Sequence, residues 1–477
     1  MADQTAFWIA GSPETSDDLV VVRNPYDGRV VGRTANATLA QVETAVAAAA
    51  KAAPDAASLP AAARAAALDH VSRRLAERGD EAAALICAEN GKPLMWAKAE
   101  LGRAVSTFRW AAEEARRFSG ELMRLDTDPA AAGRMAVVRR FPKGPVLGIS
   151  PFNFPLNLVA HKVAPAIAVG APIIVKPAPA TPLSALLLGE LLAETDLPAG
   201  MFSVVPVPNE RAAALVADPR LPVVSFTGSG PVGAAIQAAV PHKHVTLELG
   251  GNAAAVVCGD YADLDWAAQR IALFGNYQAG QSCIAVQRVV VHRDRAEAFL
   301  PKLVEAVRAL KTGDPAAADT QVGPLINEAA AERVHRWVGE AVAAGAKVLT
   351  GGGRDGANHA PTVLTDVPAD AKVGCAEVFG PVLVVSTVDS DAAAFAAVND
   401  SAYGLQAGVF TTDLQTAFTA HATLQVGGVI IGDVPSFRAD QMPYGGVKGS
   451  GVGREGLRSA MDDYTDPRVL VLTGLQL

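Results

Sequence analysis

Cysteines, concentrated positive charge and long apolar runs are scarce in this sequence. Only 4 of its 477 residues are cysteines, and no two of them have C-x-x-C spacing. That spacing is typical of structural zinc sites, so we expect no metal, and so few cysteines indicate a reducing compartment. The 41 basic residues are outnumbered by 49 acidic ones and form no long run. Because nucleic-acid binding needs a concentrated basic face, we expect no nucleic-acid partner.

Segments that would target the protein for secretion or anchor it in a membrane are also missing. The N-terminus has neither the basic start nor the apolar core of a secretory signal. The longest apolar stretch runs from Val163 to Val175, contains two prolines and is too short to cross a bilayer. We therefore expect a cytoplasmic protein without a membrane partner.

The composition is that of a folded chain with more than one domain. Hydrophobic residues make up 50% of the chain and charged residues 19%, whereas disorder needs low hydrophobicity and high net charge. The length exceeds what one hydrophobic core usually organises, so we expect two or three domains. From Pro145 onward, short apolar runs alternate with helical stretches such as residues 183–194, and a second such rhythm follows Gly250. This alternation predicts parallel α/β sheets in both parts.

Local signals mark several helices and two isolated strands. Thr38 and Gln41 have capping-box spacing, and Thr181 followed by Pro182 combines a cap residue with a proline. Composition predicts helices over residues 38–51, 61–90 and 99–118, and strands with few local partners over residues 136–141 and 469–473. Because such strands often pair elsewhere, for example at a subunit boundary, we expect a homodimer or homotetramer.

A glycine-rich turn follows the predicted strand at residues 223–226. Gly228, Gly230 and Gly233 fit the pattern G-x-G-x-x-G, and a helix-forming sequence comes next. In that context, backbone N–H groups at the helix N-terminus can hold a pyrophosphate. Such turns also serve packing, so the motif alone leaves both roles open.

Glu248 stands twenty residues after Gly228, where the dinucleotide fingerprint places an acid on the ribose. We favour a different role, because Glu248 is flanked by Leu247 and Leu249 and followed by two glycines. Burial raises the proton affinity of a carboxylate, which suits a general base. A solvated glutamate beside a turn is the alternative interpretation.

Cys283 lies in a glycine-containing loop before a predicted strand at residues 286–291. A lone cysteine is commonly buried packing, but reactive groups are often carried on such loops. A thiol also needs a base or a positive charge nearby in order to attack at neutral pH. The sequence therefore leaves a nucleophile and a packing residue as alternatives at this position.

The chain carries a series of further motifs, among them Ser-Pro-Phe-Asn-Phe-Pro at residues 150–155 and Glu-Val-Phe-Gly-Pro at residues 377–381. Together with residues 22–28, 89–93, 175–177, 226–229, 247–251, 280–283 and 443–448, they occur in the order typical of one family. The sequence resembles the aldehyde dehydrogenase superfamily along nearly its whole length. The sequence as a whole is similar to the lactaldehyde dehydrogenase branch of the superfamily, which includes enzymes for sulfolactaldehyde and phosphonoacetaldehyde.

The resemblance implies an α/β fold of three parts. A Rossmann-like cofactor domain would comprise residues 1–120 and 143–249, and an α/β catalytic domain residues 250–435. A small β oligomerisation arm would comprise residues 121–142 and 459–477.

The resemblance also implies an NAD(P)-dependent aldehyde dehydrogenase. Cys283 would attack the aldehyde carbon to give a thiohemiacetal, while the amide of Asn153 and the backbone N–H of Cys283 stabilise the oxyanion. Loss of hydride to the nicotinamide would give a thioester. Glu248 would then activate the water that hydrolyses the thioester to a carboxylic acid.

Cofactor contacts follow from the same resemblance. Lys176 would bind the adenosine ribose, Ser229 would lie near the pyrophosphate, Glu377 would hold the nicotinamide ribose and Phe379 would pack beside the ring. The remaining predicted cofactor residues are Ser150, Pro151, Phe152, Gly228 and Gly233.

The sequence departs from the family pattern at the adenosine ribose. NAD-preferring members commonly carry an acid three residues after the lysine, and here that position is Pro179. Without a carboxylate there, the 2′-phosphate of NADP is not repelled. The neighbouring sequence also has no second basic residue that could bind this phosphate. We therefore predict use of both NAD and NADP, with NAD slightly preferred.

The predicted substrate tunnel is polar where the family commonly has aromatic residues. By motif alignment, His161 and Arg438 replace aromatic side chains and Arg103 falls near a third wall position, while Asn157 and Ser282 add polarity. A single arginine is commonly a surface charge or part of a salt bridge. Convergent basic groups predict a short aldehyde with an anionic or polar far end, of the lactaldehyde, sulfolactaldehyde, phosphonoacetaldehyde or semialdehyde type.

Other functions remain open at this stage. A broad-specificity aliphatic aldehyde dehydrogenase and a CoA-acylating semialdehyde dehydrogenase share the fold, although the latter generally lacks the hydrolytic glutamate. A cysteine hydrolase would need a histidine base, and none of the 8 histidines lies in a recognisable partner motif. A catalytically silent structural protein would typically have lost Cys283, Glu248 or Asn153.

Overall fold

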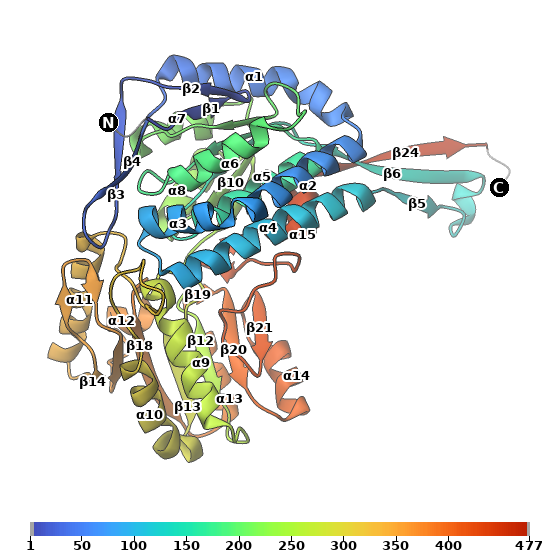
Figure 1. Cartoon of the computed structure of the whole chain (residues 1–477). Helices are drawn as coiled ribbons and strands as arrows, with labels where there is room; N and C mark the ends of the chain where they lie inside the picture. Colours follow the sequence, from blue (N-terminus) through green and yellow to red (C-terminus); the bar gives the residue numbers. More distant parts are fainter. Residues whose placement is uncertain (1–3, 475–477) are drawn as a thin grey trace.

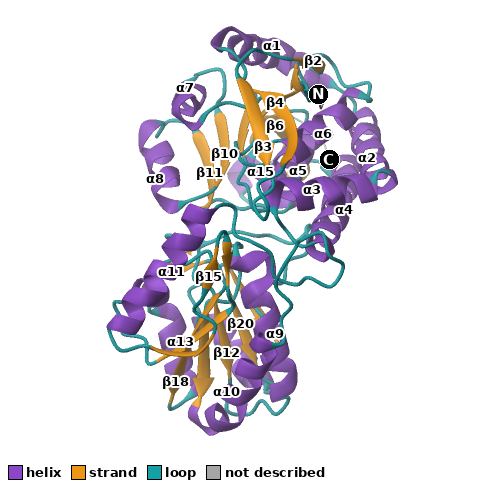
Figure 2. Ribbon diagram, turned by 60° about the vertical axis from the view of Figure 1, so that its left-hand side comes forward, coloured by secondary structure: helices purple, strands orange, loops and turns teal. Residues whose placement is uncertain are grey.

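A computed structural model describes residues 4–474 and confirms the predicted α/β class. The chain forms two α/β lobes and an arm of three strands that projects to the right in Figure 1. Figure 2 shows the two sheets one above the other, with helices on both of their faces. No helix in the described part of the chain is long and apolar enough to span a membrane.

The first lobe is built on an eight-stranded sheet of order β2-β1-β9-β8-β7-β10-β11-β23. Its strands are β1 (Phe7–Ile9), β2 (Ser12–Glu14), β7 (Val146–Ile149), β8 (Ile173–Lys176), β9 (Phe202–Val204), β10 (Val223–Thr227), β11 (His244–Glu248) and β23 (Gly451–Val452). The five strands from β9 to β11 in this order are parallel and nearly all buried, so their carboxyl ends meet at one edge. That edge is where ligands bind in open α/β sheets.

Helices cover both faces of this sheet. They are α1 (Leu39–Ser58), α2 (Ala61–Glu77), α3 (Gly79–Asn90), α4 (Leu94–Arg117), α5 (Asn157–Val169), α6 (Leu183–Ala193), η2 (Asn209–Arg211), α7 (Ala212–Ala217), α8 (Gly230–Ala239) and α15 (Leu457–Asp463). A hairpin of β3 (Leu19–Arg23) and β4 (Val30–Ala35) flanks them. The stretch predicted as one helix over residues 61–90 is two helices, because the chain leaves the helical conformation at Arg78.

Helix starts agree with the sequence in one case and differ in another. The capping box of Thr38 and Gln41 is confirmed, with both of its hydrogen bonds present. The predicted cap at Thr181 is wrong, since α6 begins after Pro182 without a side-chain cap. The buried carboxylate of Glu89 instead accepts hydrogen bonds from the backbone N–H of Leu183 and of the next residue. A cap supplied from a distant helix leaves no local sequence signal.

The second lobe contains a seven-stranded sheet of order β14-β17-β18-β13-β12-β20-β21. Its strands are β12 (Ala254–Val257), β13 (Arg288–His292), β14 (Lys347–Thr350), β17 (Thr362–Thr365), β18 (Val382–Val388), β20 (Gln406–Phe410) and β21 (Gly428–Ile431). Its helices are α9 (Leu264–Asn276), η3 (Tyr277–Gly280), α10 (Arg293–Arg308), α11 (Glu328–Ala343), α12 (Lys372–Cys375), α13 (Asp391–Asn399) and α14 (Leu414–Thr423). Short pairs join β15 (Arg354–Asp355) to β16 (Asn358–His359) and β19 (Tyr403–Gly404) to β22 (Val447–Lys448).

The arm is a three-stranded antiparallel sheet of order β24-β6-β5. It consists of β5 (Glu121–Arg124), β6 (Arg134–Pro142), β24 (Thr465–Thr473) and a short η1 turn (Pro129–Ala131). The two predicted isolated strands therefore pair with each other, in register from Thr465 opposite Pro142 to Thr473 opposite Arg134. The arm was predicted to include residues 459–463, which belong to α15, and residues 475–477, which lie outside the described part.

Candidate active site

Two cavities meet between the lobes, and Cys283 and Glu248 line both of them. The larger cavity, of about 890 Å³, lies at the carboxyl edge of the first sheet. The smaller, of about 210 Å³, lies between α4, α9 and the segment around Arg438. The Cys283 sulfur and the Glu248 carboxylate thus lie at the junction of the larger cavity, a groove, and the smaller cavity, a pocket.

Glu248 ends strand β11 and is 3% exposed. Neither of its carboxylate oxygens has a hydrogen-bond partner among the described residues. Burial, and after it the negative charge of Glu455, raise the pKa of Glu248 well above its usual range. A carboxyl group without partners and with raised proton affinity is suited to take a proton from a thiol or a water molecule.

Cys283 lies in the loop between η3 and β13, and its side chain is partly buried. The backbone just before it is strained, because Gln278 and Ala279 have φ angles of 52° and 55°, in the left-handed region. Gly280 follows them, where a Cβ would lie 2.1 Å from the carbonyl oxygen of Gly380. Close packing therefore fixes this loop and with it the position of the sulfur.

The Cys283 thiol holds its proton strongly. Burial raises its pKa to about 12, while a hydrogen bond with the Tyr444 hydroxyl acts in the lowering direction. The thiolate is the nucleophile, so a base must remove the proton before attack. Glu248 lines both cavities that Cys283 lines, and its raised proton affinity suits this role.

Asn153 lies in the loop that follows β7 and lines the larger cavity together with Cys283. Its side-chain Nδ2 donates a hydrogen bond to the backbone carbonyl of Gln281 at 2.9 Å. This bond fixes the orientation of the amide through the loop that carries the cysteine. An amide nitrogen has two donors, so the second is left for an oxyanion.

Eight of the nine predicted cofactor residues line the larger cavity. They are Ser150, Pro151, Phe152, Lys176, Gly228, Ser229, Glu377 and Phe379. Gly233 does not line it. It lies in α8 where a Cβ would be 2.5 Å from Leu249 Cδ2, so its small size serves helix packing.

The donors in this cavity fit a dinucleotide. The N-terminus of α8 has no side-chain cap at Ser229, so its backbone N–H groups are available to a pyrophosphate. The hydroxyl of Ser150 is buried and has no partner in the described part of the chain. Lys176 Nζ donates to Asn209 Oδ1 at 2.9 Å, and burial lowers the pKa of this lysine to about 8.

Glu377 and Phe379 approach the same cavity from the second lobe. Burial raises the pKa of Glu377 to about 7, and its Oε1 accepts a hydrogen bond from the backbone N–H of Gly251 at 2.9 Å. Phe379 has a φ of 47° and packs edge-on against Phe152, with 5.8 Å between ring centroids. Strain of this kind is common where a binding site over-determines the backbone.

The smaller cavity receives only part of the predicted substrate set. Arg103, Ser282 and Arg438 line it, whereas Asn157 and His161 do not. His161 is 1% exposed, and its Nε2 lies 3.0 Å from Asp440 Oδ1. Burial lowers its pKa to about 4, so it is neutral at pH 7 and adds no positive charge to the pocket. These two residues support the wall from behind.

Charged partners of the pocket arginines were not predicted. Arg103 Nη2 donates to Asp440 Oδ1 at 2.9 Å, and Arg438 Nη2 donates to Glu455 Oε2 at 3.1 Å. Glu455 also pairs with Lys162, whose Nζ lies 3.3 Å away, so two cations share one carboxylate. Arg438 therefore does not have the Glu455 carboxylate to itself.

Two further residues of the smaller cavity were missed. Arg270 lines it and pairs with Asp433, and Tyr444 lines it beside the sulfur. Tyr444 lies inside a motif that the sequence analysis quoted, residues 443–448, which was the one available signal for it.

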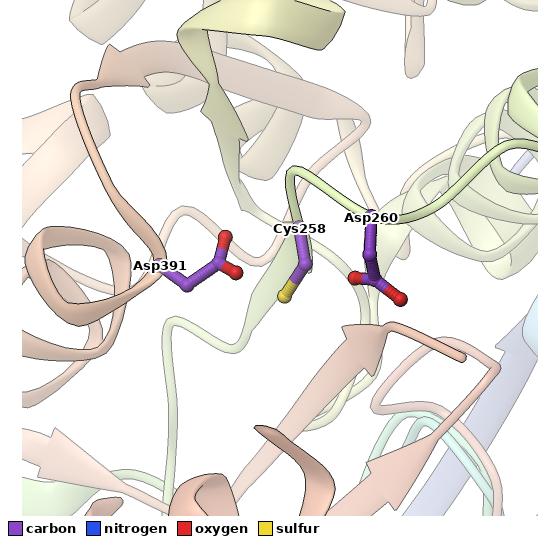
Figure 3. Close-up of side chains that lie close together, drawn as sticks. All are labelled: Cys258, Asp260 and Asp391. Atoms are coloured by element: carbon purple, nitrogen blue, oxygen red, sulfur yellow. The ribbon is translucent and has the colours of Figure 1, made fainter. Parts of the chain in front are cut away.

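One other group of potential ligands lies in the second lobe. Figure 3 shows Cys258, Asp260 and Asp391, whose ligand atoms lie within 4.8 Å of one another. Asp260 accepts hydrogen bonds from Thr411, Thr412 and Asp413, and Asp391 accepts one from the backbone of Gly259. Burial raises the pKa of the Cys258 thiol, which keeps it protonated. These contacts account for the cluster as a structural one.

Comparison with known proteins gives full-length matches. The aldehyde dehydrogenase family profile matches residues 11–470. A 3-sulfolactaldehyde dehydrogenase of Priestia aryabhattai is 41% identical over 470 residues, 98% of each chain. The crystal structure of aldehyde dehydrogenase 21 from Physcomitrella patens, in complex with the reaction product succinate, has a TM-score of 0.98 at 44% identity and covers 100% of this chain and 99% of its own. That of lactaldehyde dehydrogenase from Escherichia coli has a TM-score of 0.94 at 34% identity, with 99% and 100% covered.

Proposed function

The chain belongs to the aldehyde dehydrogenase family and is an NAD(P)-dependent aldehyde-oxidising enzyme, and on this premise we propose that it converts a short anionic aldehyde into the free carboxylic acid. One observation carries the proposal: Cys283 and Glu248 both line the groove that fits a dinucleotide and the small pocket beside it. An aldehyde bound in the pocket would therefore lie next to the Cys283 sulfur, the Glu248 carboxylate and the groove that fits the dinucleotide.

Cys283 begins the reaction after Glu248 takes the proton of its thiol. The thiolate sulfur forms a bond to the carbonyl carbon, and the free N–H of Asn153 stabilises the oxyanion of the thiohemiacetal. NAD(P), when bound in the larger cavity, supplies the acceptor for the hydride that the thiohemiacetal loses. A thioester then remains on Cys283.

After releasing the thiol proton to solvent, Glu248 completes the reaction as a general base toward water. Its unpartnered oxygens and raised proton affinity suit the removal of a proton from the water that attacks the thioester carbon. The carbon–sulfur bond breaks, the acid leaves, and the Cys283 sulfur regains a proton. A base at this position supports free acid rather than acyl-CoA as the product.

The residues that would hold the cofactor come mainly from the first lobe. Ser150 and Ser229 would bind the phosphates, Lys176 with Asn209 the adenosine ribose, and Glu377 the nicotinamide ribose. Asn209 is neutral and Pro179 takes the place of an acid, which supports use of both NAD and NADP. On this assignment residues 1–120 and 143–249 act as the cofactor-binding domain and residues 250–435 as the catalytic domain.

The smaller cavity supports an anionic substrate. Arg438 Nε is buried and has no hydrogen-bond partner among the described residues, and Arg438 and Lys162 share the single carboxylate of Glu455. A carboxylate or sulfonate tail would accept from the free guanidinium N–H. The volume of about 210 Å³ suits a short chain. Similar proteins are named for sulfolactaldehyde and lactaldehyde or were crystallised with succinate.

A panel of aldehydes with both cofactors tests this proposal. We expect succinic semialdehyde or sulfolactaldehyde to give a much higher kcat/KM than butanal, with free acid as the product. Arg438→Gln should lower kcat/KM for the anionic substrate by roughly 10- to 150-fold more than for butanal, the equivalent of a charge-assisted hydrogen bond of about 1.5–3 kcal/mol. Arg293→Gln, on an exposed ion pair with Asp389, is the matched control. Equal kcat/KM for anionic and neutral aldehydes would exclude the anionic class.

The arm supports a homo-oligomer. Leu470 and Leu122 are 57% and 63% exposed on its outer strands, and neighbouring apolar residues are exposed as well. Edge strands with apolar faces are a template for pairing with another chain. The occupant we propose is a second copy of this chain, in a dimer or tetramer.

A further inference from the structure

The hydroxyl of Tyr444 touches the reacting atom of the site. Its Oη lies 2.9 Å from Cys283 Sγ, within hydrogen-bond distance. Tyr444 is 4% exposed and packs in a small apolar cluster with Ile284 and Leu405. Its backbone forms two hydrogen bonds with Glu455, so the ring is held from both sides. The phenol is therefore fixed against the sulfur by packing on one side and backbone pairing on the other.

The chemistry of the pair decides which group donates. A thiol and a phenol can each donate to the other, but a thiolate has no hydrogen and can only accept. In the reactive state the hydrogen bond must therefore run from the Tyr444 O–H to the Cys283 sulfur. Hydrogen bonds to an ionised acceptor are the stronger kind, and the donor of this one, Tyr444, is shielded from solvent.

Arg438 strengthens the donor. Its guanidinium carbon lies 3.8 Å from the centroid of the Tyr444 ring, in a cation–π arrangement. A positive charge over the ring face draws electron density away from the phenol oxygen, which makes its hydrogen a better donor. The same charge attracts the thiolate directly, since Arg438 acts on Cys283 in the direction that favours ionisation.

We propose that Tyr444 is a catalytic residue of the aldehyde oxidation, whose hydroxyl donates a hydrogen bond to the Cys283 thiolate under the charge of Arg438. The role rests on the proposed function, in which Cys283 is the nucleophile. When the sulfur bonds to the aldehyde carbon its negative charge passes to the oxyanion, so the phenol acts on the attacking state and Asn153 on the product of attack. Tyr444 thus stabilises the negative charge while it lies on the sulfur, and Asn153 stabilises it once it lies on the aldehyde oxygen.

The size of the effect follows from two opposing trends. Loss of a donor to an anion raises the pKa of Cys283 by about one to two, which lowers the thiolate fraction roughly 10- to 100-fold at neutral pH. The remaining thiolate is more nucleophilic, with a Brønsted slope of about 0.5 that offsets half of this on a logarithmic scale. We therefore expect Tyr444→Phe to slow alkylation of Cys283 by about 3- to 10-fold.

Alkylation by iodoacetamide, followed on the Cys283 peptide by mass spectrometry, tests the proposal without the overall reaction. Three forms of position 444 are compared: tyrosine, Tyr444→Phe, and 3-fluorotyrosine, whose phenol is a stronger donor of nearly the same size. We expect the order of rates at pH 7 to be fluorotyrosine above tyrosine above phenylalanine. Tyr277→Phe is the control, because the Tyr277 hydroxyl donates to Ser282 and not to the sulfur.

The outcomes separate the proposal from its alternatives. Equal rates for tyrosine and phenylalanine would overturn it. A slow phenylalanine variant with no gain from fluorotyrosine would mean that Tyr444 acts through packing alone, which also overturns it. If Cys283→Ala retained full aldehyde oxidation, the proposed function itself would fail, whatever the alkylation rates.

Discussion

Gly250 is the residue whose replacement tests the cofactor groove most directly. A Cβ at this position would lie 2.3 Å from Glu377 Oε2 and 2.5 Å from its Cδ. Gly250 does not have a left-handed φ, so alanine fits the backbone, and Gly250→Ala acts through contact with the carboxylate. The substitution therefore moves one side chain of the proposed ribose site and leaves the fold in place.

The magnitude follows from the distances. Ordinary van der Waals contact of a Cβ begins at 3.4 Å, so the Glu377 carboxylate must retreat by about 1 Å. Such a shift breaks the 2.9 Å hydrogen bond from Gly251 N–H to Oε1 and moves the carboxylate away from the groove. The retreat also removes the proposed hydrogen bond between the carboxylate and the nicotinamide ribose. Because a hydrogen bond to a charged group contributes about 1.5–3 kcal/mol, the Kd of NAD(P) should rise roughly 10- to 150-fold.

Fluorescence titration with NADH and NADPH measures this change. The titration belongs at about pH 8, because burial raises the pKa of Glu377 to about 7 and only the ionised carboxylate accepts fully. Gly102→Ala on α4 is the control, since a Cβ there meets nothing within 4 Å and should leave the Kd unchanged.

A double-mutant cycle with Glu377→Ala completes the test. If Gly250→Ala acts through Glu377, it should add little to the loss that Glu377→Ala already causes. An unchanged Kd for Gly250→Ala, or two losses that add in full, would refute the reasoning.

Three further predictions concern charge and assembly. The pKa of Lys176, lowered to about 8, implies that the lysine is charged below that pH, so the ratio of kcat/KM for NADP to that for NAD should fall as pH rises through 8. In a Lys176→Met variant this ratio should not change with pH in steady-state kinetics. Burial lowers the pKa of His161 from 6.5 to about 4, so its contribution to the free energy of unfolding is complete above pH 6.5 and falls by at most about 3 kcal/mol as pH drops toward 4. In urea unfolding, the His161→Asn variant should therefore lose less stability than the wild type between pH 7 and 5. Equal losses would contradict the buried, neutral histidine. Leu470→Glu in the exposed arm should shift the sedimentation coefficient to that of a smaller species, whereas Leu414→Glu, at a still more exposed site on α14, should not.

The residues that could be placed from sequence are those whose neighbours in the chain carry the signal. Cys283, Glu248 and Asn153 each lie in a loop or strand end with its own motif, and parallel strands bring their carboxyl ends to one edge. The meeting of Asn153 and Glu248 follows from this topology, because β7 and β11 belong to one parallel sheet. Cys283 precedes β13 in the second lobe, so its place beside them depends on how the two lobes pack, which the sheet topology does not give.

Charge partners could not be placed in this way. His161 and Asp440 are 279 residues apart in the chain, and Lys162 and Glu455 are 293 apart. Alignment of single positions placed His161 in the substrate wall as a basic group, but burial and the contact with Asp440 are tertiary facts that leave it neutral behind the wall. The pairing of β6 with β24 within the predicted arm was not predicted for the same reason, since most of the chain separates the two strands.

Two buried carboxylates, Glu455 and Glu248, have opposite pKa shifts, and these shifts link substrate binding to the base. Burial would raise the pKa of Glu455, but the charges of Lys162 and Arg438 outweigh it and lower the value to about 2. The ionised Glu455 in turn raises the pKa of Glu248, which is the direction a base needs. On the proposed function Arg438 therefore acts twice, since it holds Glu455 ionised and would offer a free N–H to the substrate tail. Removing its charge should affect all aldehydes through the base and the Cys283 thiolate but only anionic aldehydes through the tail, so the ratio of the two losses isolates the contact with the tail.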